Sequence, residues 1–175
     1  MDYAVILLFD NVSEENISSI ISNISKENGN NYMVDNKISP HLSISLFKYN
    51  EPVDNLIKII EKNNNKFNKE LIKIASFGVF NPYVLFLSPI FENNLLNYNK
   101  NIIEILNQVE NIIFDKYYIE NNWVPHISLG VKLNENELLK GIKILTKCFN
   151  PMGIEINRIG LAECNPYKEI KIWNL

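Results

Sequence analysis

The stretch Pro40-His41-Leu42-Ser43-Ile44 recurs as Pro125-His126-Ile127-Ser128-Leu129, and each copy carries one of the two histidines of the 175-residue chain. The two histidines are 85 residues apart. Histidine is the side chain whose ordinary pKa lets it give and take protons near neutral pH. A matched pair therefore indicates one acid and one base that face a common substrate.

The repeat extends beyond these two motifs. The segments 57–59 and 142–144 both read IKI, at the same offset of 85 residues. At a slightly shorter offset, Ile72, Ile74 and Gly78 match Ile154, Ile156 and Gly160, and Asn81-Pro82-Tyr83 recurs as Asn165-Pro166-Tyr167. The chain is therefore interpreted as one unit, 1–175, built from two similar lobes at about 1–82 and 83–175, an arrangement that permits strand exchange between the lobes.

The order of elements is the same in both halves. Apolar runs, helical spacing and turn residues predict a strand over 3–9, a helix over 13–26 with Ser13 as its cap, a histidine strand over 40–48, a helix from 52 to about 66, and a hairpin over 71–80 and 83–90. The second half is predicted to continue with a helix over 93–111, a histidine strand over 123–133, a helix over 135–148 and strands over 153–163 and 167–173. The fold class expected is α+β: a bilobal, pseudo-twofold duplication whose antiparallel or mixed sheets line a central groove, with helices packed on the outer faces.

Each histidine strand is expected to have one polar and one apolar face, because successive side chains point to opposite sides of a sheet. Alternation predicts an apolar face that packs on helices, formed by Leu42, Ile44 and Leu46 in one strand and by Ile127, Leu129, Val131 and Leu133 in the other. It predicts a groove-lining face formed by His41, Ser43, Ser45 and Phe47, and by His126, Ser128, Gly130 and Lys132.

A serine two residues after a histidine lies roughly 7 Å further along the strand. Two such pairs related by a pseudo-twofold axis would place an imidazole on each side of one phosphorus atom and hydroxyl donors on its non-bridging oxygens, as in-line displacement requires. His41 and His126 are thus predicted to be catalytic, and Ser43 and Ser128 to bind phosphate. No metal is expected, because two histidines without acidic or cysteine ligands at recognisable spacing do not make a metal site; no other cofactor is expected.

Four further residues are candidates for substrate binding. Aromatic rings can stack a nucleobase and a lysine can attract phosphate. The candidates are Phe47, Phe80, Lys132 and Tyr167. For each aromatic residue, packing in the core is the alternative explanation, and for Lys132 a solvated position at the strand end.

Composition restricts the partners. The net charge is -3, with a single arginine, Arg158, so the chain lacks the basic surface of a protein that grips long nucleic acid. No apolar stretch is long enough to cross a bilayer and the first residues lack the basic start of a secretion signal, which predicts a cytoplasmic protein without membrane contact. Cys148 and Cys164 are expected to stay reduced. A monomer is expected.

At these residues the sequence resembles the two-histidine (2H) phosphoesterase superfamily, specifically its bacterial branch of 2′-5′ RNA ligase-like, RNA 2′,3′-cyclic phosphodiesterases. The family's two His-x-Ser/Thr motifs match His41-Leu42-Ser43 and His126-Ile127-Ser128. The segment 77–87 is similar to the family's central hairpin, 123–125 to its lead-in to the second motif, and Tyr167 to a tyrosine common near its carboxyl end. Gly130-Val131-Lys132 departs from the alanine-arginine pair that often follows the second motif.

The resemblance implies a metal-independent phosphoesterase of RNA processing that opens 2′,3′-cyclic phosphates at RNA or nucleotide termini to 2′-phosphates. Two alternatives remain open at this stage. One is hydrolysis or ligation of 2′-5′ phosphodiester linkages, since the superfamily includes enzymes that act on such linkages. The other is a noncatalytic module that binds nucleotides or RNA ends.

Overall fold

Eight strands form one sheet in which every pairing is antiparallel, and five α-helices cover it. This computed structural model describes residues 1–175, apart from the side chain of Asn93. The strands are β1 (Asp2–Phe9), β2 (Leu42–Lys48), β3 (Glu70–Phe80), β4 (Val84–Pro89), β5 (Ile113–Phe114), β6 (Ile127–Gly130), β7 (Met152–Cys164) and β8 (Tyr167–Asn174). The helices are α1 (Asn11–Asn28), α2 (Tyr32–Asp35), α3 (Asp54–Lys62), α4 (Asn93–Leu106) and α5 (Glu135–Cys148), with a 3-10 turn at Asn64–Lys66.

The element order confirms the predicted α+β class and the duplication. β1, α1, β2, α3 and β3 are followed by β4, α4, β6, α5 and β7 in the same alternation, and β8 closes the chain. The last strand of each half pairs with the first strand of the other half. β3 pairs with β4, and the carboxyl-terminal half of β7 pairs with β1. The two series are therefore interlocked through the sheet.

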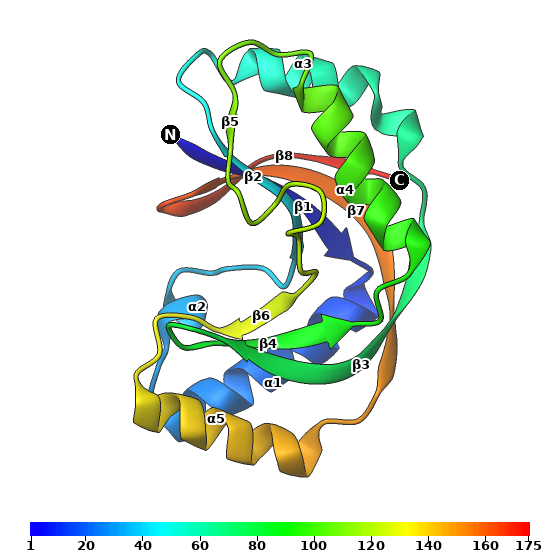
Figure 1. The fold of residues 1–175 in the computed structure, drawn as a ribbon. Helices are drawn as coiled ribbons and strands as arrows, with labels where there is room; N and C mark the ends of the chain where they lie inside the picture. The colour runs from blue at the N-terminus through cyan, green and yellow to red at the C-terminus, as the bar shows by residue number, and fades with distance from the viewer.

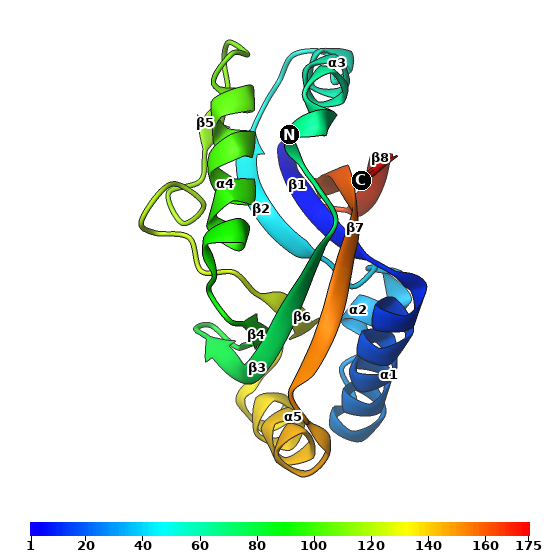
Figure 2. The same cartoon turned by 90° about the vertical axis from the view of Figure 1, so that its right-hand side faces the viewer.

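The sheet bends into two layers that face each other (Figure 1). One layer contains β2, β1, β8 and the second half of β7, and the other contains β6, β4, β3 and the first half of β7. The long strand β7 runs through both layers beside β3, as Figure 2 shows from the side. A core continuous across both layers lies beneath the helices.

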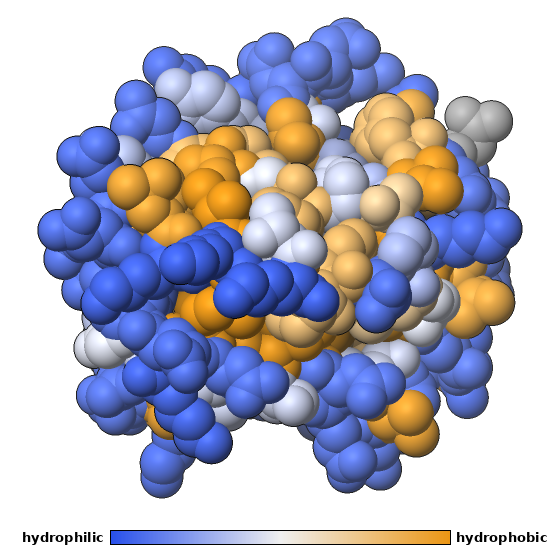
Figure 3. Space-filling model, turned by 90° about the horizontal axis from the view of Figure 1, so that it is seen from below, coloured by the Kyte–Doolittle hydropathy of each residue, from blue (hydrophilic) through white to orange (hydrophobic). Residues whose placement is uncertain are grey.

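Helices cover the outer side of each layer. α3 and α4 pack on each other, and α4 packs on β2, whereas α1 and α5 pack on each other near β6 and β4. In α1 the apolar face consists of Ile17, Ile21 and Ile24, all buried. On the side seen from below, hydrophobic residues gather near the middle and hydrophilic residues surround them (Figure 3).

Several element boundaries differ from the sequence-based prediction. Asp10, not Ser13, caps α1: its side chain accepts a hydrogen bond from the Ser13 amide, while the Ser13 hydroxyl accepts one from Glu155 N. The second histidine strand is shorter than the predicted 123–133, because only Ile127–Gly130 pairs with neighbouring strands. The helices predicted over 52–66 and 93–111 end at Lys62 and Leu106. None of the helices that the structure describes is apolar over a length that could span a bilayer.

Candidate active site

The two motif strands meet at one residue pair. β2 and β6 are antiparallel neighbours through Leu42 and Ile127, and both of these side chains are fully buried. In an antiparallel pair this register sets His41 opposite Ser128 and Ser43 opposite His126, with directly opposed Cβ atoms about 5 Å apart. Each imidazole thus lies beside the hydroxyl of the other motif, on the face away from the core.

All four side chains line one cavity of about 290 Å³, here called the histidine cavity. Part of its lining is apolar and comes from β1, β2 and β7, with Ala4, Ile6, Leu46 and Ala162. Its rim carries the polar side chains Tyr32, Tyr118, Lys132 and Tyr167.

A bulge follows the serine in both motifs. In β2, Ser43 pairs with Ile6 and Ser45 with Val5, which leaves Ile44 as an extra residue. In β6, Ser128 pairs with Phe86 and Gly130 with Leu85, which leaves Leu129 as the extra residue. An extra residue in one strand exchanges the two faces beyond it.

The bulges make the predicted faces wrong for several residues after the serines, although Lys132 lines the histidine cavity and Leu133 is buried in the core, as predicted. Leu46 and Val131, expected on the apolar face, line the histidine cavity. Ser45 is fully buried on the opposite side, and Phe47 is 1% exposed and packs against Tyr3 in the core. Phe47, predicted to share the histidine face, therefore does not line the histidine cavity.

Both imidazoles are held by the same backbone contact. Nδ1 of His41 lies 2.7 Å from the carbonyl oxygen of Ser39, and Nδ1 of His126 lies 2.8 Å from that of Val124. A carbonyl oxygen only accepts, so Nδ1 carries the proton and Nε2 remains free for the cavity. Two rings with the same tautomer thus present the same nitrogen to one space.

The surroundings of His41 include a carboxylate. The ring stacks on Tyr167, with centroids 5.4 Å apart and planes at 13°, and the Tyr167 hydroxyl donates to Glu169 Oε1 at 2.9 Å. Burial lowers the pKa of His41 and so does the positive charge that His126 can carry, whereas the Ser39 carbonyl and the negative charge of Glu169 raise it. Burial also raises the pKa of Tyr167, so its hydroxyl stays protonated.

His126 lies against aromatic edges. Its ring centroid is 4.9 Å from that of Phe80 and 5.6 Å from that of Phe86, at steep angles, and these two phenyl rings stack on each other at 4.1 Å. Burial lowers the pKa of His126, and only the Val124 carbonyl is found to oppose this. Phe80, a predicted substrate-binding residue, contacts His126 and is not part of the cavity lining.

Glycine makes room for this aromatic cluster. A Cβ built on Gly78 would lie 2.6 Å from Cζ of Phe86, which is closer than real Cβ contacts. At the matching position in the other layer, a Cβ built on Gly160 would lie 3.2 Å from its nearest neighbour, Cγ1 of Ile6. Gly78 is therefore required by the ring beside His126.

Two residues that the sequence did not reveal support the other side of the cavity. The buried amide of Asn99 in α4 donates to Ile44 O, the carbonyl of the bulge, at 2.8 Å and to Tyr118 O at 2.9 Å. Burial raises the pKa of Tyr118 to about 12, and a side-chain hydrogen bond with Ser43 acts in the opposite direction. Tyr118 is thus a neutral hydroxyl beside Ser43. The sequence feature that could have identified Asn99 is a polar residue on the apolar face of a helix. Asparagine is so abundant in the chain that this feature does not stand out.

Lys132 is the cation of the cavity rim. It follows β6 with a φ of 54°, and its Nζ lies 4.1 Å above the centre of the Tyr32 ring. Asn30 Nδ2 donates to Lys132 O at 3.3 Å, which ties this turn to the segment before α2. Tyr32 and α2 lie between the helix predicted over 13–26 and the strand predicted over 40–48, where no helix was predicted.

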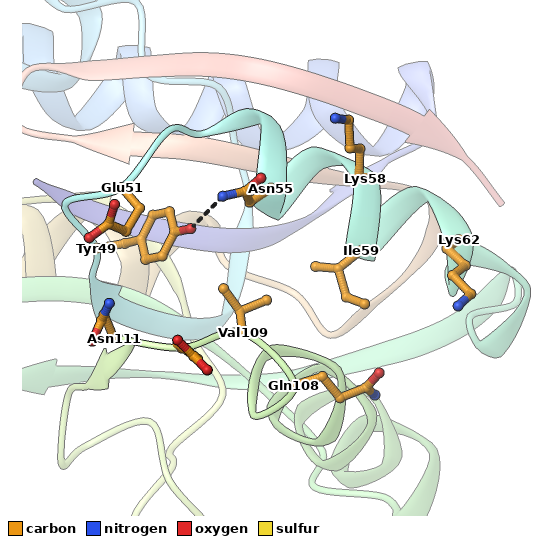
Figure 4. A pocket seen from close by; sticks show the side chains of 10 residues that line it. Tyr49, Glu51, Asn55, Lys58, Ile59, Lys62, Gln108, Val109 and Asn111 are labelled. Carbon is orange, nitrogen blue, oxygen red and sulfur yellow. Dashed lines mark hydrogen bonds between the residues drawn. The ribbon is translucent and has the colours of Figure 1, made fainter.

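Larger hollows exist elsewhere. One of about 590 Å³ lies between α3 and the segment after α4, and its mostly polar lining contains no histidine (Figure 4). There Asn55 Nδ2 donates to the Tyr49 hydroxyl at 3.3 Å. The chemistry of the lining, not the volume, therefore selects the histidine cavity as the candidate site. Among the described side chains, no three of His, Cys, Asp and Glu cluster closely enough to hold a metal ion.

The fold is shared with several solved structures. One described as a phosphoesterase has a TM-score of 0.60 at 12% sequence identity, with 99% of this chain and 98% of that chain covered. TT0787 of Thermus thermophilus has a TM-score of 0.58 at 11% identity, with 100% and 98% covered. E. coli LigT complexed with ATP has a TM-score of 0.57 at 12% identity, with 99% and 97% covered. No protein-family model and no curated protein sequence matches the chain.

These similarities define the class of fold. They extend over the whole chain and include the duplicated α+β architecture. At 10–12% identity they establish the fold and not the activity.

Proposed function

We propose that the chain is a two-histidine phosphoesterase that opens 2′,3′-cyclic phosphates at RNA or nucleotide termini, with residues 1–175 acting as one catalytic unit. The observation that carries the proposal is the Leu42–Ile127 pairing, which sets both imidazoles and both serine hydroxyls on one cavity wall. The free Nε2 atoms are the groups that an acid–base pair needs. The likeness to phosphoesterase folds, one of them described in complex with ATP, supports a nucleotide as the class of ligand.

The reaction is an in-line displacement at phosphorus. One neutral histidine takes a proton from water as the water oxygen bonds to phosphorus. The P–O3′ bond breaks on the opposite side, and the second histidine, protonated, gives its proton to O3′. The product is a 2′-phosphate with a free 3′-hydroxyl, and the two histidines have exchanged protonation states.

Ser43 and Ser128 hold the non-bridging oxygens in this proposal. Hydroxyl donors aimed at the charge that grows in the transition state are typically worth a few kcal/mol when preorganised. The partly buried cavity strengthens such contacts because it excludes water. Lys132 can add attraction for the phosphate from the rim, once its Nζ leaves the Tyr32 ring.

Turnover of a 2′,3′-cyclic mononucleotide in the presence of EDTA tests the proposal. We expect conversion to the 2′-phosphate, with the phosphate position identified by NMR, and conversion slowed by at least about 100-fold in a matched His41→Ala/His126→Ala double variant. A panel of 2′-5′ and 3′-5′ dinucleotides run in parallel distinguishes the 2′-5′ phosphodiesterase alternative. Tight binding of 2′-phosphorylated nucleotides without conversion at any pH would instead establish a noncatalytic module.

A further inference from the structure

A second hollow continues the histidine cavity toward the amino terminus. It has a volume of about 530 Å³ and shares Leu46, Cys164 and Asn165 with the histidine cavity. Its lining comes from β5, the start of β1, the end of β2 and the β7–β8 turn, and β5 and the start of β1 lie at the left of Figure 1. We call it the β5 hollow.

Sheet register relates two residues that line the β5 hollow, Leu46 and Lys48, to the histidine cavity. Ser43 pairs with Ile6, Leu46 with Ala4, and Lys48 with Asp2. Beyond the bulge, alternate residues of β2 share one face, so Leu46 and Lys48 continue the cavity side of the strand. Lys48 is roughly 15 Å from Ser43 along the strand, beyond direct reach of a phosphoryl group held by the serines.

The lining of the β5 hollow combines apolar surface with cations. Ile113, which is 67% exposed, pairs with Lys48 across β2 and β5. Lys48 and Lys116 are exposed, and neither takes part in an ion pair among the side chains that the structure describes. Two carboxylates, Asp2 and Asp115, line the same hollow, and Asp115 Oδ1 accepts a hydrogen bond from Tyr117 N at 2.8 Å within its own loop.

We infer that the β5 hollow binds the nucleotides that precede the cyclic phosphate, so that the terminus of a single-stranded oligonucleotide is a better substrate than a free mononucleotide. The inference rests on the proposed function. Everything attached to a terminal 2′,3′-cyclic phosphate lies on its 5′ side, and the β5 hollow is the continuation that shares lining with the histidine cavity past Leu46. There a nucleobase packs against Ile113, while Lys48 and Lys116 bind the phosphodiesters between nucleotides.

A comparison of two substrates tests this inference. We expect kcat/KM to be about tenfold higher for a trinucleotide ending in a 2′,3′-cyclic phosphate than for the corresponding mononucleotide. Lys48→Gln and Lys116→Gln should each lower the trinucleotide-to-mononucleotide ratio, by about threefold to fivefold, and make it less sensitive to salt. Asp2→Asn should raise the ratio, because it removes a carboxylate that repels the phosphodiester.

The control is Lys58→Gln, which removes the same charge in the separate hollow of Figure 4 and should leave the ratio unchanged. Equal kcat/KM for both substrates, or equal effects of the lysine variants on both, would overturn the inference while leaving the proposed function intact. If neither substrate is converted, the proposed function fails, and the inference is then tested by measuring the affinity for 2′-phosphorylated nucleotides. In that case a trinucleotide 2′-phosphate should bind more tightly than the mononucleotide 2′-phosphate and lose this advantage in Lys48→Gln, and equal affinities would overturn it.

Discussion

The two motif strands use the same backbone design in different surroundings. In both, a histidine precedes the strand, its Nδ1 contacts the carbonyl oxygen two residues earlier, and a bulge follows the serine. Beyond these shared features the halves diverge. His41 stacks on Tyr167, which is hydrogen-bonded to a carboxylate, whereas His126 meets the edges of Phe80 and Phe86.

The difference shows how a duplicated fold can make one site with two unlike groups. Symmetry of the backbone brings two imidazoles to one cavity with the same nitrogen free. Asymmetry of the neighbours allows the two rings to hold a proton differently, as an acid and a base must.

The largest effect is expected from the histidines themselves. His41→Ala and His126→Ala should each lower kcat for a cyclic nucleotide by about 10²- to 10⁴-fold, the range for loss of a general acid or base. The double variant should lose little more than either single one, because the two groups act as a unit. Steady-state kinetics measures this, with folding checked by circular dichroism. Multiplicative losses would show that the two imidazoles do not act in one step.

The serines should have unequal effects. Ser128→Ala should lower kcat by about 100-fold, as for loss of one preorganised donor. Ser43→Ala should cost only about tenfold, because the neutral hydroxyl of Tyr118 lies beside it and can still donate to the phosphoryl oxygen.

The double variant Ser43→Ala/Tyr118→Phe sharpens this comparison. It should reach the loss seen in Ser128→Ala, while Tyr118→Phe alone should have a small effect. A larger loss in Ser43→Ala than in Ser128→Ala would contradict the compensating role of Tyr118.

The sequence repeat predicts the catalytic candidates of this site but not the local backbone geometry around them. The duplicated motif identifies both histidines and both serines as candidates, and apolar runs and helical spacing predict most of the elements. The bulges were not predictable, because one extra residue at Ile44 or Leu129 leaves no mark on an alternating pattern such as LSISLF. Leu46 and Phe47 consequently exchange faces.

Contacts between residues far apart in the sequence also could not be predicted from the sequence pattern. The Asn99 amide bonds to the bulge carbonyl of Ile44 across 55 residues of sequence, and the helix cap at Asp10 competes locally with an equally suitable Ser13. Tyr118 and Tyr32 come from segments with no strong periodicity. Such residues are defined by the packing of the fold and not by their neighbours in the chain.

A stability difference is expected between the two glycines at matching positions of the repeat, Gly78 in β3 and Gly160 in β7. Gly78→Ala should lower the free energy of unfolding by about 1–3 kcal/mol, because the new methyl group overlaps the Phe86 ring, which Phe80 and His126 hold in place. Gly160→Ala should cost less, since its nearest neighbour, Ile6 Cγ1, is 3.2 Å away. Urea unfolding of both variants measures the difference, and a greater loss in Gly160→Ala would contradict the packing around His126.

The pH dependence should reflect burial of both rings. Burial lowers the pKa of each histidine from its ordinary value of about 6.5. The active form needs one neutral and one protonated histidine, so kcat/KM should follow a bell-shaped profile with its maximum below about pH 6.5. The acid limb marks protonation of the base, and the alkaline limb marks loss of the proton from the acid.

The smallest expected effect assigns the two roles. The negative charge of Glu169 raises the pKa of His41, and no carboxylate is found to act on His126, so His41 is the ring better suited to hold the proton as the general acid. Glu169→Gln removes this charge but keeps an oxygen that can accept from the Tyr167 hydroxyl. It should lower the pKa of His41 and move the alkaline limb of the kcat/KM profile to lower pH, whereas the exposed Glu61→Gln, with the same change in net charge, should leave both limbs in place. Movement of the acid limb instead would make His41 the base, and movement of neither limb would show that the carboxylate beside Tyr167 does not distinguish the two halves.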